Sequence, residues 1–238
     1  MAIAIRQITA QEKRMVADLV DHYKANQKIF DVMLEQLRNA IHGSPNLMGS
    51  VHSTKWRLKD PLHLRDKLER KLRESTEKRK KFSINKENLF NHVNDLAGFR
   101  ILHLHTQQII AIDKALREIF DEYRYDLIEG PTARTWDDES REFFNAAGIK
   151  PMNSPTLYTS VHYIVRANSR AALTCEIQVR TLAEELWGEV DHSLNYPHKS
   201  KSLPCREQIK VLARVTSSCS RLVDAIFATA DDHKKARK

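Results

Sequence analysis

Two short segments alternate between polar and apolar residues, and this alternation constrains the fold more than any other feature of the sequence. The segments span residues 157–165 and 174–181. Their polar positions are, in chain order, Tyr158, Ser160, His162, Glu176, Gln178 and Arg180. Successive side chains of a strand point to opposite faces of the sheet, so each segment is expected to bury one face and present the other. The polar face of both strands is a candidate surface for chemistry.

Helical patterns surround these strands. Thr181-Leu182-Ala183-Glu184 has the form of a capping box, which predicts a helix from Thr181 to Pro197. Asp60 followed by Pro61 predicts another helix start. Further helices are expected within the first forty residues, over 109–123 and over 205–229, with a shorter one near 140–147 and another strand at 99–105.

Strands interspersed with helices predict an α/β (α+β) fold, a mixed sheet of roughly five strands flanked by helices. The order of the strands cannot be inferred from this pattern. The chain is expected to divide into an N-terminal helical segment (1–50), a sheet-bearing domain (51–200), and a C-terminal helix (201–238) whose charged tail frays.

Positive charge is concentrated in one part of the chain. The formal net charge is +8, and residues 55–81 hold twelve Lys or Arg against five Asp or Glu. Such a cluster suits a polyanion such as a nucleotide, a phosphate or RNA. A solvated basic helix face is the alternative interpretation.

The cysteines and the hydropathy pattern indicate a cytoplasmic protein. The three cysteines are odd in number and lack CxxC spacing, so neither a disulfide framework nor a zinc site is expected. No signal peptide is visible, and no apolar run approaches the roughly 20 residues that span a bilayer. A membrane is therefore not an expected partner.

Several residues have the chemistry that a metal-assisted nucleotide site requires. The candidates are the cations Arg57, Lys59 and Lys67, the carboxylates Asp95 and Glu176, and the aromatic ring of Tyr158. Cations hold phosphates, carboxylates hold a divalent metal, and an aromatic ring stacks on a base. Each also has a structural interpretation: solvated cations, a turn residue at Asp95, a same-face pair of Glu176 with Arg180, and sheet packing of Tyr158.

Four motifs occur in one order along residues 55–196. They are Arg57-Leu58-Lys59-Asp60-Pro61 with Lys67-Leu68, Asp95-Leu96-Ala97-Gly98-Phe99-Arg100-Ile101, Tyr158-Thr159-Ser160-Val161-His162, and Glu176-Ile177-Gln178-Val179-Arg180-Thr181. In content and order these motifs resemble the synthetase domain of the RelA/SpoT family, with Trp187 and Asp191-His192 following at a family-like spacing. The resemblance does not cover the first forty or the last forty residues.

The resemblance implies a stand-alone alarmone synthetase with a nucleotidyltransferase-like sheet. Its reaction would be attack of a ribose 3′-hydroxyl of GDP or GTP on the β-phosphate of ATP, which releases AMP and makes (p)ppGpp. The implied roles are ATP binding for Arg57, Lys59, Lys67 and Arg100, catalysis and Mg²⁺ binding for Asp95 and Glu176, and acceptor binding for Tyr158, His162, Gln178 and Arg180.

The acceptor is left open by a departure from the family pattern. Many guanosine-nucleotide users carry a Pro-Lys-x-Asn-Gly run before the tyrosine, where this chain has Asn153-Ser154-Pro155-Thr156-Leu157. One alternative is a toxic small synthetase that pyrophosphorylates the 3′ end of tRNA. A second is an inactive nucleotide- or RNA-binding regulator, against which the two carboxylates argue. A second copy of the chain and an antitoxin protein are further candidate partners.

Overall fold

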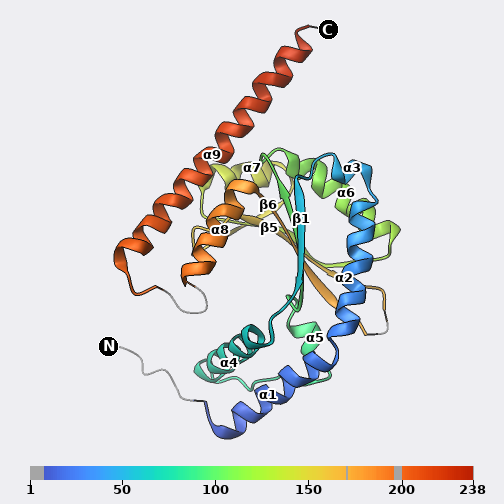
Figure 1. Ribbon diagram of the computed structural model, residues 1–238, viewed down its shortest axis with the longest axis vertical. Coiled ribbons are helices and arrows are strands. Elements are labelled where there is room, and N and C mark those ends of the chain that lie inside the picture. Colours follow the sequence, from blue (N-terminus) through green and yellow to red (C-terminus); the bar gives the residue numbers. More distant parts are fainter. Residues whose placement is uncertain (1–7, 170, 196–199, 238) are drawn as a thin grey trace.

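The computed structural model describes residues 8–169, 171–195 and 200–237, and its centre is one mixed sheet (Figure 1). Its six strands are β1 (Ser53–Leu58), β2 (Ala97–His103), β3 (Asp126–Thr135), β4 (Lys150–Asn153), β5 (Ser160–Arg166) and β6 (Thr174–Thr181). The mixed α/β prediction is confirmed, with six strands rather than roughly five. No strand was expected at β1, β3 or β4, because the alternation of these segments is too weak to mark them.

The strand order β1-β2-β6-β5-β3-β4 places segments distant in sequence next to one another. The pairs β2–β6 and β3–β4 are parallel, and the other neighbours are antiparallel. In this register Lys55 lies opposite Arg100, which in turn lies opposite Gln178. Three strands therefore contribute to one row of polar side chains.

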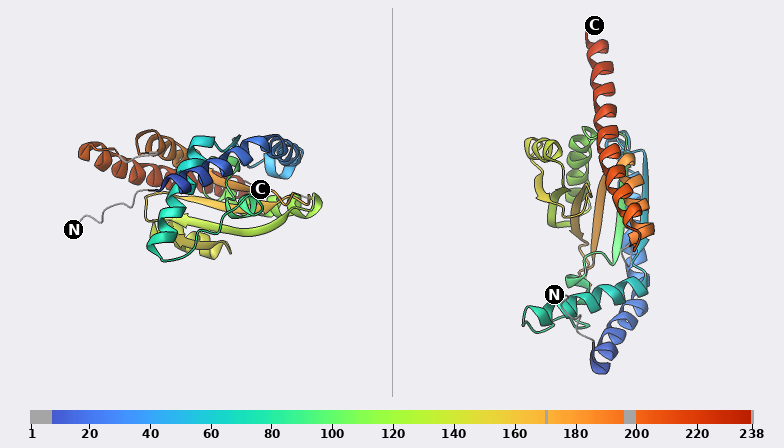
Figure 2. Two further views of the ribbon diagram at one scale, coloured as in Figure 1. Left: turned by 90° about the horizontal axis from the view of Figure 1, so that it is seen from below. Right: turned by 90° about the vertical axis from the view of Figure 1, so that its left-hand side faces the viewer.

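Helices cover both faces of the sheet and extend beyond its ends (Figures 1 and 2). They are α1 (Ala10–Ala25), α2 (Gln27–His42), α3 (Pro45–Met48), α4 (Pro61–Glu77), α5 (Leu89–His92), α6 (Gln108–Glu122), α7 (Asp138–Ala146), α8 (Leu182–Asn195) and α9 (Leu203–Lys235). The predicted end of α8 at Pro197 lies outside the described residues. None of the helices in the described ranges is both long and apolar enough to cross a membrane.

The two faces of the sheet have different environments. Phe99, Ile177 and Val179 point into the main core, where they pack with apolar residues of α2 and α6. The opposite face carries Arg100 and Glu176 and lies under α8. The alternation in the sequence thus produces one packed face and one face available for polar chemistry.

Helix starts and one buried tyrosine position the segments that carry the predicted site. Asp60 caps α4 by accepting hydrogen bonds from the backbone N–H groups of Leu62 and His63. The fully buried hydroxyl of Tyr23 donates to the carbonyls of Lys59 (2.9 Å) and Leu96 (3.2 Å). Because these carbonyls flank β1 and β2, α1 holds together the ends of the two strands next to Lys59 and Asp95.

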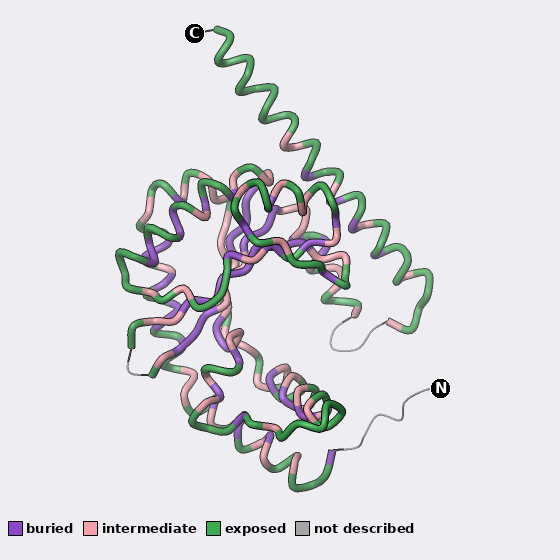
Figure 3. The backbone as a smooth tube through the Cα atoms, turned by 180° about the vertical axis from the view of Figure 1, so that it is seen from behind, coloured by how far each residue is buried: buried purple, intermediate pink, exposed green. Residues whose placement is uncertain are grey.

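The C-terminal helix differs from its prediction in both length and orientation. It continues to Lys235, so the tail that was expected to fray is helical. Val215, Leu222 and Ile226 were expected to pack, but 57–63% of each residue is exposed. Figure 3 shows the distal half of this helix as almost entirely exposed.

The face of α9 that docks is partly polar. Its buried residues are Ile209, Ala213, Thr216 and Ser220, which follow one another at helical spacing. Ser220 and Thr181 place their hydroxyl oxygens 3.1 Å apart. Hydrogen bonds to the body therefore select the buried face, and the more apolar stripe points away from it.

Candidate functional site

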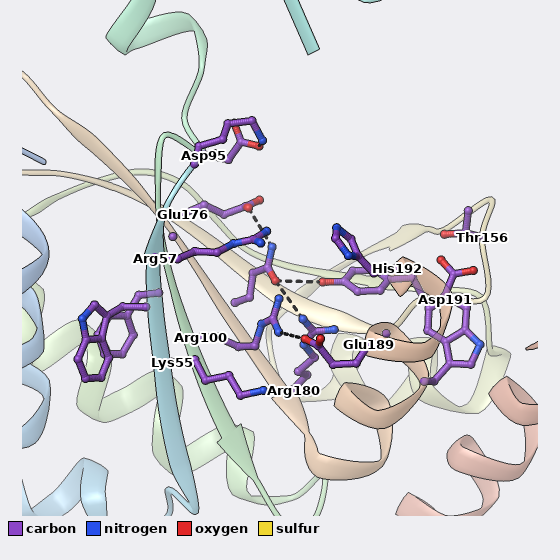
Figure 4. A pocket seen from close by; sticks show the side chains of 18 of the residues that line it. Lys55, Arg57, Asp95, Arg100, Thr156, Glu176, Arg180, Glu189, Asp191 and His192 are labelled. Carbon is purple, nitrogen blue, oxygen red and sulfur yellow. Dashed lines mark hydrogen bonds and ion pairs between the residues drawn. The ribbon is translucent and has the colours of Figure 1, made fainter. Parts of the chain in front are cut away.

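A cavity of about 820 Å³ lies on the polar face of the sheet beneath α8 (Figure 4). Eight of the ten predicted site residues line it: Arg57, Lys59, Asp95, Arg100, Tyr158, Glu176, Gln178 and Arg180. Of the other two, Lys67 contacts Asp95, and His162 contacts Glu176 and Tyr158. The structure therefore brings together residues from four separate motifs.

Asp95 lies at one end of this cavity between two lysines. It occupies the turn before β2, and its two carboxylate oxygens accept from Lys59 Nζ (2.9 Å) and Lys67 Nζ (2.6 Å). Lys59 follows β1, and Lys67 is presented by α4 after the Asp60 cap. Burial raises the pKa of Asp95, but the charges of Lys67 and Lys59 outweigh it and hold the pKa below its ordinary value. Asp95 is therefore an ionised carboxylate at neutral pH.

Glu176 is the second carboxylate of the site, and its hydrogen-bond partners are an imidazole and an amide. Its Oε1 lies 3.0 Å from His162 Nδ1, and its Oε2 accepts from Gln178 Nε2 at 2.9 Å. Burial raises the pKa of Glu176, the hydrogen bond and charge of His162 lower it, and the net effect is a lowered pKa. The negative charge of Asp95 acts on this pKa in the opposite direction, which shows that the two carboxylates interact.

Tyr158 was expected on a strand, and the structure places it two residues before β5. Its hydroxyl lies 3.3 Å from His162 Nε2 and 3.4 Å from Gln178 Oε1, so it still faces the polar side of the sheet. The guanidinium of Arg180 lies over the ring, 5.5 Å from its centroid. Trp187 of α8 is a second aromatic neighbour, with ring centroids 6.3 Å apart.

At the other end of the cavity, Arg100 and Arg180 are joined by three charged residues that were not assigned from the sequence: Lys55, Glu185 and Glu189. The side chain of Glu185, on α8, is only 8% exposed. It accepts from Lys55 Nζ at 2.9 Å and from Arg100 at 2.7 Å, and lies 2.9 Å from Arg180 Nε. Glu189, one helical turn later, accepts from Arg100 at 2.7 Å. Burial lowers the pKa of Arg100, and these two carboxylates raise it beyond its ordinary value.

The sequence features that could have identified these additional residues differ in strength. Lys55 belongs to the basic run, and Asp191 and His192, which also line the cavity, are part of the family-like spacing. Glu185 has no such signal, because acidic residues are common in the first turn of any helix. Only the packing of α8 on the sheet distinguishes it from a solvated residue.

The carboxylates suit Mg²⁺ bound together with a phosphate. Within the described residues, no group of three or more His, Cys, Asp or Glu side chains could form an all-protein metal cage. Mg²⁺ commonly uses one or two carboxylates and completes its shell with water and substrate phosphates. Asp95 and Glu176, both ionised oxygen donors at one cavity, fit that pattern.

Comparison with known families and structures agrees with this fold. Residues 56–201 match the region found in RelA / SpoT proteins, so the chain belongs to the RelA/SpoT family. Among curated proteins, none matches the chain.

Solved structures are similar over nearly the whole chain. A GTP pyrophosphokinase family protein from Streptococcus pneumoniae has 17% identity and a TM-score of 0.57, covering 96% of this chain and 97% of its own. Small alarmone synthetase 1 from Bacillus subtilis has 19% identity and a TM-score of 0.54, with 92% and 97% covered. The latter protein has also been solved bound to its product pppGpp, at 19% identity and a TM-score of 0.52, with 88% and 93% covered. At these identities the structures establish a shared fold.

Proposed function

We propose that this protein is a GTP/GDP pyrophosphokinase, which transfers the β,γ-pyrophosphate of ATP to the ribose 3′-hydroxyl of GDP or GTP and releases AMP. One observation carries the proposal. The ionised carboxylates Asp95 and Glu176 share a single cavity with a row of cations and with the aromatic ring of Tyr158. This combination meets the needs of phosphoryl-group transfer, which depends on positioning and on charge neutralisation.

The donor side is assigned to the end of the cavity near Asp95. Arg57, Lys59 and Lys67 are cations from β1, its following turn and α4. Arg100 of β2, which lies farther along the cavity, would add a fourth contact to the triphosphate. Triphosphate binding would let the two lysines exchange part of their contact with Asp95 for phosphate oxygens. Asp95 would then be free to bind Mg²⁺ together with Glu176.

The acceptor side is assigned to Tyr158 and the polar residues around it. Its ring would stack on the acceptor base, while His162, Gln178 and Arg180 orient the ring and the ribose. The product complex of the Bacillus subtilis synthetase supports a guanosine acceptor for proteins of this fold. In the proposed reaction the 3′-oxygen forms a bond to the β-phosphorus. The bond between the β-phosphorus and the oxygen that bridges it to the α-phosphorus breaks, and AMP leaves with that oxygen.

Glu176 is proposed to orient the attacking hydroxyl and to accept its proton as the new bond forms. Its hydrogen bonds to His162 and Gln178 fix both carboxylate oxygens, which suits a group that must hold one geometry. The metal, when bound, would offset the negative charge that develops on the phosphates.

Thin-layer chromatography with γ-labelled ATP tests the proposal, with GDP, GTP and deacylated tRNA offered in separate reactions. Label is expected to appear on GDP or GTP, because the γ-phosphate moves with the transferred group. Label on tRNA alone would assign the enzyme to the alternative acceptor, and label on none would contradict the proposal.

Asp95→Asn supplies the matched control. The amide retains the shape of the side chain but loses the charge that binds the metal, so turnover is expected to fall by about two orders of magnitude or more. A circular dichroism melt checks that the variant is folded. Near-normal turnover in a folded Asp95→Asn protein would overturn the metal assignment.

A further inference from the structure

The buried carboxylate of Glu185 joins three strands through their cations. Lys55, Arg100 and Arg180 come from β1, β2 and β6, and each has a side-chain nitrogen within 2.9 Å of Glu185. The three cations do not depend on Glu185 equally. The side chain of Lys55 is 56% exposed to water, and Arg100 has a second carboxylate partner in Glu189.

Arg180 is the cation that depends on Glu185 most. Its side chain is only 4% exposed, and among the described residues Glu185 is the carboxylate within ion-pair distance of it. Its other polar partner is the neutral amide oxygen of Gln178, at 3.4 Å. A guanidinium this buried requires a carboxylate partner, because an unpaired charge in the interior is strongly unfavourable.

The helix above Arg180 is shaped to accommodate it. A Cβ atom added at Gly188 would lie 2.4 Å from one terminal nitrogen of Arg180. The glycine therefore lets the guanidinium pass beneath α8 and lie over the ring of Tyr158. Glu185 and Gly188 act on Arg180 from the same helix, one by charge and the other by absence of a side chain.

We propose that Glu185 is a positioning residue that holds Arg180 over Tyr158 and so prepares the platform for the acceptor base. The proposal rests on the acceptor role given to Tyr158 in the proposed function. Arg180 covers one face of the ring, which restricts the ring to one orientation and leaves stacking to its other face. Glu185 acts through Arg180 and does not itself touch the acceptor.

Stability alone is a weak explanation for this ion pair. Burying two charges costs desolvation free energy that their attraction only partly offsets, and apolar residues in such places are often as stable. An ion pair that fixes one side-chain geometry beside a binding surface has a reason to be retained that a purely structural pair lacks.

Isothermal titration calorimetry with two variants tests the proposal, using GDP and α,β-methylene-ATP as separate ligands. Glu185→Gln removes the charge and keeps the shape of the side chain. Gly188→Ala keeps every charge, favours the helix, and displaces only the far end of Arg180. Both variants are expected to raise the Kd for GDP by about tenfold, on the scale of a partly lost stacking contact. Gly188→Ala leaves both carboxylate partners of Arg100 in place, so it is expected to change the Kd for the ATP analogue less than about twofold, whereas Glu185→Gln also removes a charge beside Arg100 and is expected to weaken the ATP analogue as well.

Glu189→Gln is the contrasting variant. It lies on the same helix and contacts Arg100 but not Arg180, so it is expected to affect the ATP analogue rather than GDP. If Glu185→Gln does not fold, Gly188→Ala decides the question, since its charges are unchanged. Equal weakening of both ligands in Gly188→Ala, or no change for GDP in that variant, would overturn the positioning role.

The experiments distinguish an error in the proposed reaction from an error in the positioning role of Glu185. A wild-type protein that binds GDP but labels no acceptor contradicts the proposed reaction, and the ratio of the two Kd values still tests the role of Glu185. A wild-type protein that labels GDP, with unchanged GDP affinity in Gly188→Ala, contradicts only the positioning role.

Discussion

At the scale of single residues, the two carboxylates of the site are held in different ways. Asp95 pairs with the ammonium groups of two lysines, whereas Glu176 is hydrogen-bonded by His162 of the neighbouring strand β5 and by Gln178 of its own strand β6. Lysines can exchange a carboxylate for a phosphate with little movement of the backbone. This difference explains why donor binding is assigned to the Asp95 end and hydroxyl orientation to Glu176.

Lys59→Met is expected to weaken ATP binding by about 1.5–3 kcal/mol, the range of a hydrogen bond to a charged group. Lys78→Met is the matched control, because Lys78 is an exposed residue at the end of α4, in the same basic run. Titration of both variants with an ATP analogue checks this. Equal losses would mean that the charges act as a diffuse field and that Lys59 is not part of a specific site.

His103 is expected to make stability depend on pH. Burial lowers its pKa to about 4 from 6.5. As the pH falls from 6.5 to 4, the unfolded state binds a proton that the folded state does not, so the free energy of unfolding decreases. The difference reaches about 3 kcal/mol, at 1.36 kcal/mol for each pKa unit.

Urea unfolding of wild type and His103→Gln across this pH range checks the prediction. The buried Glu184, whose pKa burial raises to about 7, acts in the opposite direction below pH 7 and is present in both proteins. The difference between the two proteins therefore isolates His103. Parallel stability curves for the two proteins would contradict the prediction.

At the scale of elements, α8 links the pocket to the remainder of the fold. The expected capping box is present: Thr181 N donates to Glu184 at 2.8 Å, and Glu184 N donates to the Thr181 hydroxyl at 3.2 Å. The box begins α8 immediately after β6, so Glu185 and Gly188 fall above the cations of the sheet. Trp187 then donates to the Ile209 carbonyl and connects α8 to α9.

The two faces of α9 are expected to respond differently to substitution. Ile209→Ala removes a residue that is 6% exposed and should cost about 2–5 kcal/mol of unfolding free energy. Leu222→Gln changes a residue that is 63% exposed and should stay within about 0.5 kcal/mol. Equilibrium denaturation of both variants measures this. A large loss for Leu222→Gln would show that another molecule covers the outer face in solution.

At the scale of the whole molecule, charge distinguishes the possible acceptors. The chain carries a net charge of +8, and twelve of its cations belong to residues 55–81, which contain most of β1 and the whole of α4. Such a field attracts any polyanion, so attraction by itself does not identify the acceptor. The number of acceptor phosphates that the protein contacts distinguishes a nucleotide from a tRNA.

The affinity for GDP is expected to fall gently with salt, because a nucleoside diphosphate contributes few phosphate contacts. A tRNA acceptor would contact many phosphates, and its affinity would fall steeply as counterions compete. Measuring the Kd of each between 50 and 200 mM salt, in the range where about 10³–10⁵-fold losses occur for 6–10 contacts, separates the two. Tight, salt-resistant binding of tRNA would contradict this account of the surface.

The local sequence determined most of the helices, three of the six strands and most of the residues of the candidate site. The Asp60-Pro61 start, the capping box at Thr181 and the alternation of residues 174–181 depend on neighbours in the chain, and the structure contains all three. The four motifs supplied ten candidate residues, and eight of them line one cavity in the structure.

Only the tertiary structure decided strand order, the position of Tyr158 before β5, the docked face of α9 and the contacts of Glu185. Each depends on a partner far away in the chain: Glu185 lies 130 residues from Lys55 and 85 from Arg100. Local periodicity states which side chains share a face, but not which surface that face will meet. Burial and hydrogen bonds between distant segments determine which surfaces pack together, and these contacts form only when the whole chain folds.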